Sequence, residues 1–163
     1  MKSLVSLKHC LFVLFLGMAL LMFGGTLEPC QGHAANAYDL SEWQGRITNH
    51  QARHLKHEVN FVVLRAQDGS RRPDRQYQHD SKVMQRAHVP YGAYSFALYR
   101  NSKAARQEAD NLYYQAPQAK FYVNDIEVNH AGRRLNSATK AWAREMKSLT
   151  TRPIVLYSYA NFI

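Results

Sequence analysis

Two carboxylates separated by a single residue, Asp125 and Glu127, are the residues of this sequence best placed for chemistry. They follow the apolar segment 121–123, which has the composition of a strand. In an extended chain, residues i and i+2 point to the same side about 6.5 Å apart, so both side chains would project together. Because two such carboxylates repel, one keeps its proton to a higher pH. The pair could supply the acid and the charged carboxylate that cleave a glycosidic bond; a solvated loop is the alternative interpretation.

Two further acids, Asp39 and Asp68, are expected at the same edge of the fold. Asp39 lies in a short segment, 38–40, and Asp68 follows the apolar run 61–64. In parallel α/β folds the active site lies at the carboxyl ends of the strands. Four acids would therefore meet at one rim, which favours a functional interpretation of the Asp125 and Glu127 pair.

Aromatic side chains accompany these acids. Trp43 comes shortly after Asp39 in an expected loop, and further aromatic residues lie in the expected strands, namely Tyr94, Phe96 and Tyr157. Aromatic faces beside carboxylates suit sugar rings, which have apolar faces and hydroxyl rims. The pattern predicts a carbohydrate-binding groove.

Strand and helix patterns alternate between residues 38 and 163. Strands are expected at 38–40, 61–64, 89–98, 121–127 and 154–157. Helices are expected at 49–58 and 76–87, and two more are expected to be capped by Ser102 and Ser137. About five strands separated by four helices predict a parallel α/β sheet with right-handed crossovers, in a doubly wound fold or a β/α barrel. No glycine-rich phosphate loop follows any expected strand, so no nucleotide cofactor is expected.

Residues 1–37 have the layout of a secretory signal peptide. Lys2 and Lys8 precede the uncharged segment 10–23, and small residues offer cleavage sites ending at Ala34 and Ala37. An uncleaved anchor is the alternative, because the apolar stretch reaches about 18 residues. We expect a leader over 1–37 and one catalytic domain over 38–163. The protein would be secreted and associated with the cell wall, with membrane contact only through an uncleaved leader.

The charge balance favours an anionic partner. Lys and Arg total 21 against 12 Asp and Glu, a formal net charge of +9, which suits nucleic acid, a membrane surface or an anionic cell wall. The leader and the expected acidic rim argue against nucleic acid. His50, His54 and His57 lie on one helix face at zinc-ligand spacing, but no acid or cysteine completes a set, so no metal is expected.

Five segments, in order along the chain, resemble family 25 of the glycoside hydrolases, the lysozyme (N-acetylmuramidase) family. They are YDLSEWQG at 38–45, FVVLRAQDG at 61–69, YGAYSF at 91–96, VNDIE at 123–127 and RPIVLYS at 152–158. The resemblance implies a β/α (TIM-like) barrel that cleaves the β-1,4 bond between N-acetylmuramic acid and N-acetylglucosamine. Bacterial peptidoglycan would be the partner, without a cofactor or metal.

The same resemblance implies roles for individual residues. Glu127 looks like the general acid/base. Asp125 would be its partner, either stabilising the oxocarbenium-like centre or orienting the acetamido group of the substrate, and Asp39 would be a supporting carboxylate. Asp68 stands where a Glu is more usual in the family. The expected substrate-binding residues are Trp43, Asp68, Tyr94, Phe96 and Tyr157.

The sequence ends at Ile163, just after the fifth expected strand. The resemblance implies three further strands and another active-site carboxylate, and a closed barrel usually needs about 200 residues or more. We therefore expect a partial barrel that lacks the last strands and has impaired activity. The alternative is a catalytically inactive fragment that binds the cell wall.

Overall fold

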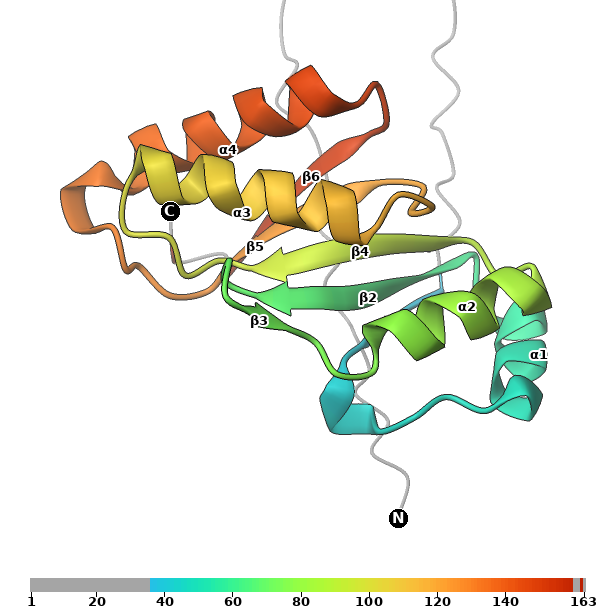
Figure 1. Cartoon of the computed structure of the whole chain (residues 1–163). Helices are drawn as coiled ribbons and strands as arrows, with labels where there is room; N and C mark the ends of the chain where they lie inside the picture. The colour runs from blue at the N-terminus through green and yellow to red at the C-terminus, as the bar shows by residue number, and fades with distance from the viewer. Residues whose placement is uncertain (1–35, 160–161, 163) are drawn as a thin grey trace, which may run out of the picture. The chain divides into compact units, whose positions relative to one another are not determined.

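The computed structural model describes residues 36–159 and 162 (Figure 1). The expected leader therefore falls outside the described residues, apart from its last two positions. Ala37 begins the first strand, and the Asn36 side chain donates to the Glu58 carbonyl at 3.2 Å. Cleavage after Ala34 would leave this strand whole, and the leader itself stays a prediction. Within the described range, no helix is long and apolar enough to cross a membrane.

Strands and helices alternate as the sequence predicted. The strands are β1 (Ala37–Leu40), β2 (Phe61–Asp68), β3 (Arg72–Pro73), β4 (Tyr91–Phe96), β5 (Tyr122–Ile126) and β6 (Ile154–Ser158). The α-helices are α1 (Asn49–Glu58), α2 (Tyr77–Ala87), α3 (Ser102–Gln115) and α4 (Leu135–Leu149), and two 3-10 helices are η1 (Glu42–Gln44) and η2 (Gly132–Arg134).

Five of the strands form one parallel sheet in the order β1-β2-β4-β5-β6. The sheet curls into a half-barrel, and in Figure 1 α3 and α4 lie side by side along it. The two-residue β3, which the sequence did not predict, pairs antiparallel with β2. The expected partial β/α barrel is confirmed.

Two of the expected helix caps were wrong. Asn101, not Ser102, caps α3: its backbone is extended, and its side chain accepts a hydrogen bond from the Ala104 amide at 3.0 Å. Ser137 lies within the first turn of α4, where its hydroxyl donates to the Arg134 carbonyl at 2.8 Å. The 3-10 turn η2 runs directly into α4 and replaces a side-chain cap.

The core lies between the sheet and the helices. Leu64 of β2 and Tyr122 of β5 are buried beneath helix residues that include Leu112, Trp142 and Met146, all at most 2% exposed. Core positions alternate in the strands, as Val62 and Leu64 do in β2, and lie three or four residues apart in the helices, as Trp142 and Met146 do in α4. Burying each such side chain contributes about 1.5–3 kcal/mol, so this layer stabilises the half-barrel.

A β-bulge in β2 decides which side chains share the opposite, inner face. Arg65 pairs with β4, and the pairing resumes at Gln67, so Ala66 is an extra residue in the strand. Gln67 consequently faces the helices, where its amide donates to the Glu108 carbonyl at 2.8 Å. Asp68 then faces the same side as Arg65, although it is three positions further along the chain and a regular strand would place it on the opposite side.

Inner-face residues of neighbouring strands line up in rows across the sheet. One row near the carboxyl ends joins directly paired residues of four strands, namely Asp68, Phe96, Asp125 and Tyr157. The next row contains Arg65, Tyr94, Val123 and Val155.

Aromatic rings close the other end of the inner face. Phe61 and Phe121 meet edge to face, with ring centroids 5.3 Å apart. Gly92 lies beside them, and a Cβ at this position would come within 2.3 Å of the Phe121 ring. Position 92 therefore needs glycine because the Phe121 ring occupies the space of a side chain.

We predict that Gly92→Ala lowers the free energy of unfolding by about 1–3 kcal/mol, the usual cost of overpacking. Chemical denaturation measures the loss. In a Phe121→Leu background the same substitution should cost clearly less, because the ring that it meets is gone. Equal costs in both backgrounds would show that Phe121 is not the constraint.

Candidate active site

The inner face gathers most of the residues that the sequence singled out. Asp39 is paired with Val63 of β2, and Glu127 lies one residue beyond the end of β5. Together with them, this face carries Asp68, Tyr94, Phe96, Asp125 and Tyr157. Elements far apart in sequence thus bring seven predicted site residues to one face.

Asp125 is the most perturbed of the inner-face carboxyls. It is 7% exposed, and burial raises its pKa to about 8, with the charges of Glu127 and Asp39 adding to the shift and Arg65 opposing it. One carboxyl oxygen, Oδ1, is buried and has no hydrogen-bond partner among the described residues. Asp125 therefore holds a proton near neutral pH and keeps an acceptor unused.

Asp39 belongs to the same electrostatic cluster. Removal of water by the surrounding protein raises its carboxyl pKa, although part of the residue is exposed. Hydrogen bonding to Tyr94 acts in the opposite direction, the Glu127 charge adds to the rise, and Arg65 opposes it. Asp39, Asp125 and Glu127 are therefore close enough to influence one another's charge.

Glu127 has a partner that the sequence did not reveal. The Tyr159 hydroxyl donates to Glu127 Oε2 at 2.8 Å, and this bond raises the pKa of Tyr159. Tyr159 follows Tyr157 by two residues, the spacing that keeps side chains on one face of a strand. That spacing was the available signal, but the bond depends on β6 lying beside β5.

Arg65 is a buried cation that pairs with two acids outside the inner-face cluster. Its Nε donates to Asp74 Oδ2 at 2.9 Å and its Nη2 to Glu42 Oε1 at 3.0 Å. Arg75 and Arg72 also pair with Glu42, whose pKa is lowered, first by the hydrogen bond from Arg75. Arg65 lowers the pKa of the inner-face acids Asp39 and Asp125 only in part.

Asp68 and Trp43 differ from the other inner-face candidates. Asp68 accepts a hydrogen bond from Arg72 at 2.9 Å, so it extends the ion-pair network around Glu42. Trp43 lies on η1 and is 72% exposed. Within residues 36–159, no hydrogen bond or ring contact joins the Trp43 side chain to the carboxylates. Their proposed contacts with substrate stay predictions.

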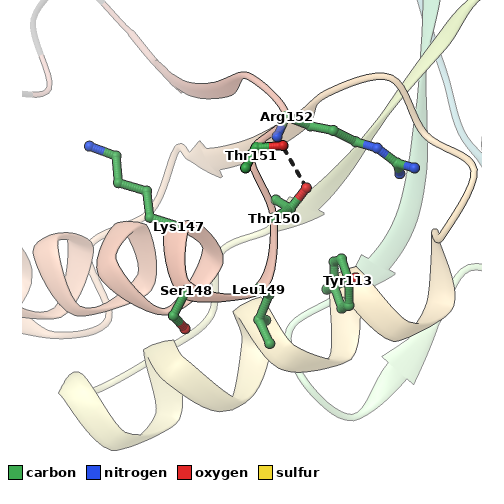
Figure 2. A pocket seen from close by; sticks show the side chains of 7 residues that line it. All are labelled: Tyr113, Lys147, Ser148, Leu149, Thr150, Thr151 and Arg152. Carbon is green, nitrogen blue, oxygen red and sulfur yellow. Dashed lines mark hydrogen bonds between the residues drawn. The ribbon is translucent and has the colours of Figure 1, made fainter.

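The pocket in Figure 2 lies elsewhere. Its volume is about 420 Å³, and it surrounds the turn between α4 and β6 at the amino end of the sheet, away from the carboxylates. Lys147 and Arg152 extend to opposite sides of this turn. Arg152 donates to the carbonyls of Pro117 and Ala119 at 2.6 and 2.8 Å, so its role there is structural.

The described residues contain no group of three His, Cys, Asp or Glu side chains arranged to hold a metal ion. His50, His54 and His57 are exposed on α1, and His54 Nε2 lies 2.9 Å from Glu58 Oε1.

A curled parallel sheet with clustered carboxylates at the carboxyl ends of its strands defines the β/α-barrel class of domain. The family model described as "Glycosyl hydrolases family 25" matches residues 38–163, and the chain belongs to this family. The resemblance inferred from the sequence motifs is thereby confirmed. No curated protein sequence matches the chain significantly.

Solved structures share the fold. The catalytic domain of endolysin ply40 from Listeria monocytogenes bacteriophage P40 is 22% identical, with a TM-score of 0.69 over 75% of this chain and 62% of that one. The glycosyl hydrolase 25 GHIP of Streptococcus pneumoniae is 19% identical, with a TM-score of 0.69 over 77% and 60%. A lysozyme of Streptomyces coelicolor is 23% identical, with a TM-score of 0.59 over 74% and 60%. The chain thus spans about three fifths of these proteins.

We predict that Arg65→Met lowers the free energy of unfolding by about 3–5 kcal/mol, because the buried Asp74 carboxylate then keeps only backbone amide donors and loses its cation. Arg72→Met is the matched control, since Arg72 also pairs with Glu42 but is half exposed, and it should cost much less. Urea denaturation compares the two. Equal losses of stability in the two variants would contradict the conclusion that the buried ion pair of Arg65 stabilises the fold more than the exposed pair of Arg72.

A second prediction concerns pH. The unfolded chain ionises Asp125 near its ordinary pKa of 3.8, whereas the folded chain keeps the proton up to about 8. Stability therefore falls as the pH rises through this window. Asp125→Asn removes that fall and should raise the free energy of unfolding at pH 7 by roughly 1–4 kcal/mol relative to the wild type.

Denaturation at pH 4, 6 and 8 checks this difference, which should be small at pH 4 and grow toward pH 8. Asp110→Asn on α3 serves as the control, because it removes a carboxyl outside the inner face. Parallel pH profiles of the wild type and Asp125→Asn would contradict the raised pKa.

Proposed function

We propose that this protein hydrolyses peptidoglycan outside the cell, cleaving the β-1,4 bond between N-acetylmuramic acid and N-acetylglucosamine. Membership of glycosyl hydrolases family 25 supports the class of reaction. The observation that carries the proposal is the carboxylate cluster on the inner face, in which Asp125 keeps its proton to about pH 8 beside Glu127. Such paired carboxyls with separated protonation are what glycoside hydrolysis uses.

Glu127 is the proposed general acid/base. It lies just beyond β5, so its side chain is less enclosed than that of Asp125, and the Tyr159 hydroxyl orients one of its oxygens. Glu127 would take over the proton that Asp125 holds and donate it to the leaving glycosidic oxygen as the C–O bond breaks, which leaves Asp125 charged. It would then take a proton from the water that attacks the sugar.

Asp125 is the proposed partner carboxylate. Once it has lost its proton, its charge would stabilise the cationic sugar centre, or its unpartnered Oδ1 would accept a hydrogen bond from the acetamido N–H of the substrate. Asp39, close to Tyr94, would add negative potential to the same site. Asp125 thus acts at the sugar ring, whereas Glu127 acts at the leaving oxygen.

Sugar binding is assigned to the aromatic residues around this cluster. Tyr157 is 43% exposed and directly opposite Asp125, and Phe96 pairs with Asp125 from the other side. Their rings offer apolar surface to a pyranose face. Trp43 and Asp68 would extend the surface on the side of β1 and β2.

A wall-binding protein without catalysis is the second candidate. The chain spans 62% of the ply40 catalytic domain, and β1 and β6 are the two end strands of the described sheet. In this alternative the inner face still binds the glycan, but the carboxylates perform no hydrolysis.

The test is Glu127→Gln, assayed by the release of reducing sugar ends from purified peptidoglycan. Loss of the acid/base should lower the rate about 10²–10⁴-fold, whereas Glu58→Gln on α1 should leave it unchanged. Sedimentation with insoluble peptidoglycan is measured in parallel. If neither the parent chain nor Glu127→Gln releases sugar but both sediment, the wall-binding alternative holds. Full activity of Glu127→Gln would overturn the assigned role.

A further inference from the structure

A second pocket, outside the active site, lies between α3 and α4. Its volume is about 450 Å³. We name it the α3–α4 groove, and it is lined by Ser102, Arg106, Ser137, Lys140, Ala141, Arg144, Glu145 and Ser148. We propose that this groove binds the phosphodiester backbone of an anionic polymer of the cell wall. Only the wall origin of the polymer rests on the proposed function.

The cations of the groove are available for an external partner. Arg106 comes from α3, and Lys140 and Arg144 come from α4, one helical turn apart. All three are exposed, and within the described part of the chain none of them forms an ion pair with a carboxylate. Glu145 is the single acid of the lining, so the groove carries a net positive charge.

The remaining polar groups favour an anion over a neutral sugar. The Ser137 and Ser148 hydroxyls already donate to the Arg134 and Glu145 carbonyls of their own helix turns, at 2.8 and 2.7 Å. Guanidinium and ammonium groups therefore supply most of the free donors, and these groups match phosphate oxygens. No aromatic ring lines the groove to stack on a pyranose.

The same lining distinguishes between polyanions. Single-stranded nucleic acid is usually held by aromatic side chains that stack on the bases, and none is present here. A membrane-binding helix inserts large apolar side chains, whereas Ala141 is the only apolar residue of the lining. A phosphodiester chain without bases or acyl groups needs neither, so it fits the groove best.

The shape suits a chain rather than a single phosphate. The lining of α4 runs from Ser137 to Ser148, which corresponds to about 16 Å along the helix axis. Lys140 and Arg144 are separated by about 6 Å along this axis, with Arg106 contributed by the neighbouring helix. An extended polymer can therefore place successive phosphates against successive cations.

The test measures binding of the wild-type chain to poly(glycerol phosphate) and to purified walls, before and after chemical removal of their phosphodiester polymers. The triple variant Arg106→Gln/Lys140→Gln/Arg144→Gln should bind the polymer and the intact walls about tenfold more weakly. The slope of log K against log salt should decrease in magnitude by about 2. The control Arg53→Gln/Lys56→Gln/Lys82→Gln removes the same charge from exposed positions on α1 and α2 and should change binding less than about twofold.

Several results would overturn the proposal. The first is an equal loss of polymer binding in the groove and control variants. The second is equal binding of the wild type to stripped and intact walls. The third is tighter binding of the groove to single-stranded DNA or phosphatidylglycerol vesicles than to the polymer. Sugar release from stripped peptidoglycan should be the same in the groove variant and the wild type. Failure of that chemistry with intact polymer binding would contradict the proposed function alone.

Discussion

Crowding of negative charge on one face of a curled sheet is the constraint on which the rest of this structure depends. Asp39, Asp125 and Glu127 are brought together by strands that pair over long sequence separations, and burial and mutual repulsion raise the pKa of Asp125. The buried cation Arg65 lowers the pKa of Asp125 only in part, and it forms ion pairs with Glu42 and Asp74 instead. Because Arg65 pairs with Glu42 and Asp74, it stabilises this edge of the sheet and still leaves the pKa of Asp125 raised. The chemistry proposed for Asp125 depends on that balance.

The supporting structure keeps the acids in place from two sides. Behind the sheet, the apolar layer beneath α3 and α4 determines which residues of each strand face inward, since alternate side chains must be buried. Within β2, the bulge at Ala66 changes that alternation once, so that Asp68 joins the inner face and Gln67 reaches α3. A regular strand would have exchanged these two side chains. The bulge therefore sets where the ion-pair network of Arg72 meets the inner face.

Periodicity alone predicted the five parallel strands and four helices, because the alternation of apolar residues follows directly from burial of one face. The D-x-E spacing likewise predicted that Asp125 and Glu127 influence each other. The caps of α3 and α4 were misplaced. Asn101 and Ser102 are both suitable capping types, and α4 continues from a 3-10 turn without any side-chain cap. The bulge, β3 and the bond from Tyr159 to Glu127 could not be predicted. Each depends on a partner strand or loop whose position is decided only by the complete fold.

The distribution of the positive charge completes this electrostatic arrangement. The chain has a formal net charge of +9, yet Arg106, Lys140 and Arg144 lie on helices that cover the outer side of the sheet. None of these three cations is among the charges that shift the pKa of Asp39 or Asp125, and exposed charges beyond about 10 Å are largely screened at moderate salt. Had they faced inward, they would have lowered the pKa of Asp125 and removed its proton near neutral pH. Binding of the proposed anionic wall polymer needs positive charge, whereas a raised pKa at Asp125 needs its absence nearby. The two properties can coexist in one small domain because the cations and the carboxyls lie on opposite sides of the sheet.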